Sequence, residues 1–122
     1  MLKTAAIVFG VVFLLVGVLG FVPGITTNEM LLGIFHVNTV HNVVHLLSGA
    51  VALGTGLSST AAARLYFRVF GVVYALVAVL GFVVGNGLLL GLISNNTPDT
   101  LLHVVIAAAS LVLGFVVKDA SI

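Results

Sequence analysis

Two helix-spaced pairs of polar residues are the part of this chain that could do chemistry. His41 and His45 lie four residues apart, and so do Asp99 and His103. Side chains at this spacing lie on one face of a helix. If the two helices face each other, three imidazoles and one carboxylate converge, and this set of ligands suits zinc or non-haem iron. The spacing therefore predicts a metal site formed by His41, His45, Asp99 and His103.

Other interpretations of the same histidines stay open. His45 and His103 alone could hold a b-type haem as its two axial ligands. The small residues Gly49 and Ala107, each four positions further along, would leave room for the ring. A purely structural interpretation has each imidazole bonded to a neighbouring carbonyl, to the facing histidine or to interfacial water. A proton-responsive role is a further alternative, because histidine titrates near neutral pH.

The elements that carry these residues belong in a membrane. Of the 122 residues, 61% are hydrophobic and only 6% are charged, whereas a soluble domain has roughly 25% charged residues. Membrane-spanning backbone must satisfy its own hydrogen bonds, so helices are expected. We predict a single all-α membrane domain over residues 1–122, a bundle of four transmembrane helices at about residues 5–22, 40–57, 65–84 and 101–117.

The sequence contains two copies of one two-helix unit. Residues 9–24 and 70–85 are identical at 12 of 16 positions, with an offset of 61. After a gap the offset becomes 58, which aligns Asn38 with Asn96 and His45 with His103. We therefore predict two tandem hairpins, about residues 5–57 and 65–117, related by a pseudo-twofold axis along the membrane normal. Because the first span has a near-copy in the third, it is expected to be retained and not cleaved as a signal peptide.

The starts of the second and fourth helices can be predicted from capping residues. Thr97 is expected to be the N-cap, with Pro98 at the first helical position and Asp99 in the first turn. The alignment makes Thr39 the matching N-cap. His45 and His103 then lie six residues inside their helices, about 9 Å along the axis, in the outer third of the membrane.

Charge predicts the orientation and excludes some partners. All four basic residues fall on one side of the predicted spans: Lys3, Arg64, Arg68 and Lys118. The positive-inside rule then predicts a multi-pass protein of the cytoplasmic (inner) membrane with both termini in the cytoplasm. A net charge of +1 leaves no basic footprint for nucleic acid. The absence of cysteine from the sequence excludes thiolate metal sites.

Small and basic residues suggest how the helices contact their surroundings. The spacings Gly20-xxx-Gly24 and Gly81-xxx-Gly85 predict close helix packing, either inside the bundle or at a homo-oligomer contact. Arg64 and Arg68 are expected to reach anionic lipid headgroups. The short apolar segments 30–35 and 88–93 are expected to lie at the interface or to tuck back as partial turns.

The chain resembles a bacterial membrane family known as the domain of unknown function 4383. The likeness covers nearly the whole chain and rests on four runs: GVVFLLVGVLGFVPG, HNVVHLLSGA, RVFGVVYALVAVLGFV and PDTLLH. It implies a four-span integral membrane protein and no particular activity. Ala107 departs from the family pattern, in which a glycine follows the histidine by four residues. The architecture alone is also similar to DoxX-type membrane proteins, which would suggest redox or quinone-linked surroundings.

Three functions follow as hypotheses. The sequence contains no nucleophile, P-loop or zinc-protease motif, which favours a non-enzymatic protein that acts by association, as a homo-oligomer or as an accessory subunit in the lipid bilayer. The first alternative is a haem- or metal-binding membrane protein using the outer ends of spans two and four. The second alternative is a carrier or enzyme for a lipid-soluble substrate such as a quinone, which would require a pocket open to lipid in the outer leaflet.

Overall fold

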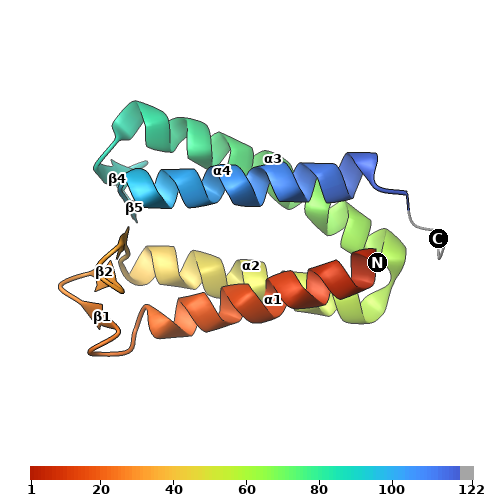
Figure 1. Cartoon of the computed structure of the whole chain (residues 1–122), viewed down its shortest axis with the longest axis horizontal. Helices are drawn as coiled ribbons and strands as arrows, with labels where there is room; N and C mark the ends of the chain where they lie inside the picture. The colour runs from red at the N-terminus through yellow and green to blue at the C-terminus, as the bar shows by residue number, and fades with distance from the viewer. Residues whose placement is uncertain (119–122) are drawn as a thin grey trace.

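Four long helices dominate the computed structural model, which describes residues 1–118 (Figure 1). The fourth helix continues into a short π-helix, η1. All four are long and apolar enough to cross a membrane, so the prediction of an all-α, four-span protein is confirmed. Their bounds are α1 (Leu2–Leu19), α2 (Thr39–Ser58), α3 (Thr60–Val84), α4 (Thr97–Leu111) and η1 (Val112–Val116).

The helices pair in the order of the chain. In Figure 1 the red α1 lies along the yellow α2, and the green α3 lies along the blue α4. Ser59 alone separates α2 from α3, as the C-cap of one helix and the N-cap of the other. We call the end where the short strands lie the strand end. The opposite end, which carries Lys3, Arg64, Arg68 and Lys118, is the basic end.

The two outer segments form short antiparallel strands, which differs from the predicted interfacial partial turns. Pairing gives backbone donors and acceptors partners within the protein, which a membrane interface favours. Both segments turn in the same way, because Leu32 and Leu90 have positive φ and are each followed by a positive-φ glycine. The strands are β1 (Thr26–Thr27), β2 (Met30–Leu31) and β3 (Phe35–His36) in one sheet, and β4 (Gly87–Leu89) and β5 (Ile93–Asn95) in the other.

The N-caps of α2 and α4 are Asn38 and Asn96, one residue before the predicted Thr39 and Thr97. The Asn96 side chain accepts a hydrogen bond from the backbone N–H of Asp99, and the Asp99 carboxylate accepts one from the backbone N–H of Asn96, at 3.0 and 3.1 Å. In a capping box the acid lies three positions after the N-cap, and Asp99 lies three positions after Asn96 but only two after Thr97. The threonine prediction was therefore wrong.

Glycines bring the helices of each hairpin into close contact. A Cβ added to Gly10 of α1 would lie 2.7 Å from the backbone nitrogen of Leu53 in α2. A Cβ added to Gly71 of α3 would lie 2.9 Å from the side chain of Leu111 in α4. Gly10 aligns with Gly71, and Leu53 with Leu111, so the two hairpins pack at matching positions. The pseudo-twofold axis itself stays a prediction.

In each of the two Gly-xxx-Gly spacings, only the first glycine lies in a helix contact. Gly20 packs against Asn42, and Gly81 packs against Thr100. Gly24 and Gly85 have φ of +90° and +69°, and a Cβ added to either would meet no atom within 4 Å, so these glycines serve backbone conformations that favour glycine. The contacts of these glycines therefore lie inside the hairpins, and the homo-oligomer contact stays a prediction.

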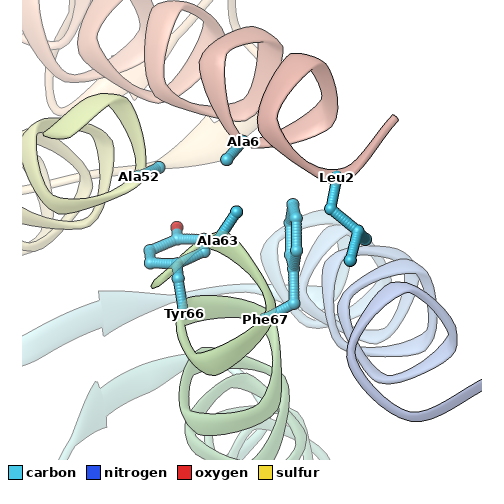
Figure 2. Packing of buried hydrophobic residues seen from close by; sticks show 6 residues of the cluster. All are labelled: Leu2, Ala6, Ala52, Ala63, Tyr66 and Phe67. Atoms are coloured by element: carbon cyan, nitrogen blue, oxygen red, sulfur yellow. The ribbon is translucent and has the colours of Figure 1, made fainter. Parts of the chain in front are cut away.

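An apolar cluster joins the two hairpins at the basic end. Figure 2 shows the ring of Phe67, from α3, beside Leu2 of α1. Phe67 also meets the edge of Phe9, with ring centroids 5.0 Å apart. The cluster consists of Leu2, Ala6, Ala52, Ala63, Tyr66 and Phe67. Its burial packs α1, α2 and α3 together at the basic end.

The arginines of α3 bond to the chain itself. Arg64 Nη1 donates to the carbonyl oxygens of Gly114 and Val117, at 3.2 and 2.8 Å, and Arg68 Nε donates to that of Gly114 at 2.7 Å. We call these contacts the arginine clamp. Carbonyls at a helix C-terminus lack intrahelical donors and favour cations. The donors that were expected to reach lipid headgroups therefore stabilise the end of η1.

Candidate functional site

Three of the four predicted metal ligands converge between α2 and α4. His41, His45 and His103 each offer one ring nitrogen, and these nitrogens lie within 4.8 Å of one another. The ring centroids are 4.8 Å apart for His41 and His45, 5.7 Å for His41 and His103, and 6.2 Å for His45 and His103. Each side chain is at least nine-tenths buried. We call these three residues the histidine cluster.

The hydrogen bonds of His41 fix which of its nitrogens is free. Its Nδ1 lies 2.8 Å from the carbonyl oxygen of Ser94 and 3.1 Å from that of His36. Both partners are acceptors, so Nδ1 carries the hydrogen and donates. In the neutral ring Nε2 then holds a lone pair. Metal-bound histidines are oriented in this way, through a second nitrogen that donates to a carbonyl or carboxylate.

Each ring of the histidine cluster has one buried nitrogen without a hydrogen-bond partner among residues 1–118. These atoms are His41 Nε2, His45 Nδ1 and His103 Nδ1. Buried polar atoms nearly always have a partner, because losing water without compensation costs about 1–3 kcal/mol each. Three of these atoms belong to the histidine cluster, and the fourth such atom in residues 1–118 is Asn42 Oδ1.

Asp99 and His36 lie outside the cluster. Asp99 Oδ2 accepts from the backbone N–H groups of His36 and Asn96, both at 3.1 Å. The carboxylate therefore bonds to backbone at the start of α4. The His36 ring is partly exposed and lies 3.5 Å from the Glu29 carboxylate. The structure thus brings together three of the predicted ligands and places the fourth in the helix cap.

Reciprocal hydrogen bonds join the two outer segments over the cluster. Asn38 Nδ2 donates to the Leu92 carbonyl, and Asn96 Nδ2 donates to the Ile34 carbonyl, both at 2.9 Å. These four residues align with one another in the repeat. We call these bonds, together with the His41–Ser94 and His36–Asp99 bonds, the loop clasp. It closes the strand end above the histidine cluster.

Two grooves approach the histidine cluster from the sides of the bundle. The α2–α3 groove has a volume of about 280 Å³ and is lined by all three histidines. The α1–α4 groove has a volume of about 220 Å³ and reaches His45. Exposed apolar side chains border both, Leu47 and Val73 on one and Val8 and Val12 on the other. The sides of the bundle near the strand end are therefore not packed solid.

The α2–α3 groove contains a hydroxyl pair that the sequence analysis did not identify as functional. Ser48 Oγ lies 2.9 Å from Tyr74 Oη, and both side chains are buried. Tyr74 aligns with Phe13 in the repeat, and Ser48 aligns with Ile106. The sequence would have revealed this pair if the two copies had been compared for positions that are polar in one copy and apolar in the other.

The geometry of the cluster suits a metal ion with an open coordination position. Imidazole binds zinc, copper, iron and nickel, and zinc–nitrogen bonds are about 2.0–2.1 Å. Two nitrogens on a tetrahedral ion are then roughly 3.4 Å apart, so rotamer adjustments would have to close the present spacing by up to about 1.4 Å. Three protein ligands leave a fourth position for another molecule.

Comparison with known proteins identifies a family and no activity. The family described as "Domain of unknown function (DUF4383)" matches residues 3–116, which include the cluster, the loop clasp and both grooves. No curated protein and no solved structure matches the chain. The chain therefore belongs to the DUF4383 family.

Proposed function

We propose that this protein binds a divalent transition-metal ion in the membrane, with His41, His45 and His103 as ligands. The observation that carries the proposal is the convergence of three buried imidazoles, each with one unpartnered ring nitrogen. The His41 hydrogen bonds to the Ser94 and His36 carbonyls support it, because they present the lone pair of Nε2.

An ion fits the histidine cluster better than haem does. Axial haem ligation uses two imidazoles on opposite faces of a wide, flat ring. His41 stacks on His45 with an interplanar angle of 23° and also lies beside His103. A macrocycle between His45 and His103 would have to displace this third ring, whereas an ion would use it.

The distribution of charge supports the proposed orientation. The four basic residues lie at the basic end, and the histidine cluster lies near the strand end. On the positive-inside rule we expect the termini on the cytoplasmic side of the inner membrane and the cluster in the outer leaflet. Single cysteines at Thr27 and Ser59 test this: a membrane-impermeant thiol reagent should label the first in intact cells and not the second.

The metal is tested on protein purified in detergent. We expect one zinc or other transition-metal ion per chain by elemental analysis. After treatment with a chelator, added Co²⁺ should give the visible absorption of a low-symmetry, imidazole-bound ion. His45→Gln and His103→Gln should each lower the affinity by more than about 100-fold, which exceeds the effect of losing an outer-shell partner.

His36→Gln is the matched control, because His36 lies outside the cluster and should leave Co²⁺ binding unchanged. Far-ultraviolet circular dichroism and gel filtration show whether each variant keeps its fold. A folded wild-type protein without stoichiometric metal and without the cobalt signal contradicts the proposal. A Soret band would show that haem is the ligand instead.

A further inference from the structure

The geometry points to the α2–α3 groove as a binding site for a small lipid-dissolved phenol, that is, a single apolar ring with a hydroxyl group. The site goes beyond the metal proposal and concerns the protein without the ion, because a metal on His41 Nε2 would use the lone pair that the ligand needs. It rests on three features of the groove: its apolar walls, its opening toward lipid and the polar atoms at its inner end.

The position of the groove selects a ligand from the membrane. Its mouth is formed by side chains that are largely exposed on the membrane-spanning helices, including Leu47 at 62% and Val73 at 45%. At the strand end the loop clasp ties the two outer segments together. Apolar molecules dissolved in lipid therefore have direct access from the side.

The polar atoms select a ligand that donates a hydrogen bond. His41 lines the groove, and its Nε2 is an acceptor because Nδ1 donates to carbonyl oxygens. This nitrogen is buried and has no partner among residues 1–118. A ligand hydroxyl can donate to it, whereas an ether or a ketone cannot.

The hydroxyl pair can complete the recognition. Ser48 and Tyr74 have two hydroxyl hydrogens between them, and their mutual bond uses one. The second hydrogen is free to reach a ligand oxygen. A phenolic hydroxyl can donate to an imidazole and accept from a hydroxyl at once, so it can use both kinds of polar group among the lining residues.

Volume and wall chemistry limit the rest of the ligand. A cavity of about 280 Å³ lies at the lower limit of small-molecule pockets, which start at roughly 300 Å³. It holds one ring with short substituents. Phe70 and Tyr74 contribute aromatic walls and Val77 an aliphatic one, and aromatic rings pack well against such surfaces.

The α1–α4 groove provides the control within the same chain. It is lined from α1 by Phe9, Val12, Phe13 and Val16, which align one by one with Phe70, Val73, Tyr74 and Val77 of the α2–α3 groove. In place of Tyr74 and Ser48 it has Phe13 and Ile106, and His41 does not line it. A ring without a hydroxyl would therefore fit either groove equally well.

The test uses 4-fluorophenol and its methyl ether, 4-fluoroanisole, as probes in fluorine NMR. The protein is treated with a chelator and held in lipid nanodiscs, so that metal does not occupy the imidazoles. We expect saturable binding of the phenol, with the ether about tenfold weaker, as the loss of one or two hydrogen bonds implies. Tyr74→Phe combined with Ser48→Ile, which copies the lining of the other groove, should reduce phenol binding to the level of the ether.

The mirror variant, Phe13→Tyr with Ile106→Ser, should leave phenol binding at the first groove intact. Equal affinity for both probes, or a Tyr74→Phe, Ser48→Ile variant that binds the phenol like wild type, overturns the inference. If the double variant does not fold, Tyr74→Phe alone and the comparison of the two probes on wild type decide. Co²⁺ binding by the folded double variant should be unchanged, so a failure of this site and a failure of the metal site can be told apart.

Discussion

The two hairpins of this protein share a scaffold and differ in their polar chemistry. Their helices meet at aligned glycines, and their outer segments exchange aligned asparagine bonds. Between α2 and α3, however, the chain has the Ser48–Tyr74 pair, where the opposite side has Ile106 and Phe13. The aligned positions of the two hairpins thus share their packing contacts, and they differ in the polar groups that a ligand could use.

His41 and Asp99 show how the copies diverge. They align in the repeat, and each bonds to the backbone of the opposite outer segment. His41 donates to the Ser94 carbonyl, whereas Asp99 accepts from the His36 N–H. The same contact is made with opposite polarity. The consequence is asymmetric, because His41 keeps a ring nitrogen for the cluster and Asp99 uses its carboxylate in the cap.

The largest expected effect separates these two aligned residues. His41→Gln removes a proposed ligand and should weaken Co²⁺ binding by more than about 100-fold. Asp99→Asn keeps the cluster and should change the affinity by less than about tenfold. Cobalt titration by visible absorption measures both variants. Equal losses of Co²⁺ affinity would show that His41 and Asp99 contribute alike to metal binding, which contradicts the difference proposed between them.

The second effect concerns the aligned glycines. Gly10→Ala places its Cβ 2.7 Å from a backbone nitrogen, which cannot move away cheaply. Gly71→Ala meets first a flexible leucine side chain at 2.9 Å. Overpacking costs about 1–3 kcal/mol, and the gain in helix propensity offsets up to about 1 kcal/mol.

We therefore expect Gly10→Ala to lower the free energy of unfolding by about 1–2 kcal/mol, and Gly71→Ala to leave it within about 1 kcal/mol of wild type. Titration with a denaturing detergent, followed by circular dichroism, gives both values. A larger loss for Gly71→Ala would mean that the second hairpin is the more tightly packed one.

The smallest effect tests the loop clasp. Asn96→Ala removes an N-cap and the bond to the Ile34 carbonyl, and Asn38→Ala removes an N-cap, the bond to the Leu92 carbonyl and a long bond of 3.4 Å from the Ser94 N–H. Each should lower the free energy of unfolding by about 1 kcal/mol. These bonds hold the same two segments together, so the double variant should lose less than the sum of the single losses, by roughly 0.5 kcal/mol. Detergent denaturation of the wild type, the two single variants and the double variant measures this difference. Strict additivity would show that the outer segments are held independently.

The helices could be predicted from sequence because lipid imposes a simple rule on composition. Long apolar runs in a chain with 6% charged residues leave few alternatives. The strands were missed because they are two or three residues long, too short for any periodicity. The cap at Asn96 was missed because Asn and Thr are both good N-caps. The spacing between Asn96 and Asp99 would have decided between them.

The site was predicted in part for a different reason. Spacing along a helix placed His41 with His45, and the repeat matched His45 with His103. Whether spans two and four meet depends on tertiary packing, which no local pattern contains. Asp99 was assigned to the metal because carboxylates are common ligands, but the N–H groups of His36 and Asn96 bind it in the cap. Whether the Asp99 carboxylate caps α4 or joins the histidines depends on the tertiary structure, which the spacing of residues does not contain.

The arginine clamp has a consequence for biosynthesis. Arg64 and Arg68 belong to the third helix, but the carbonyls they bind lie at Gly114 and Val117, between 46 and 53 residues later in the sequence. During translation these arginines enter the membrane long before their partners exist. The clamp can form only after η1 has been synthesised, so it joins the start of α3 to the end of η1 at a late stage of folding of the second hairpin.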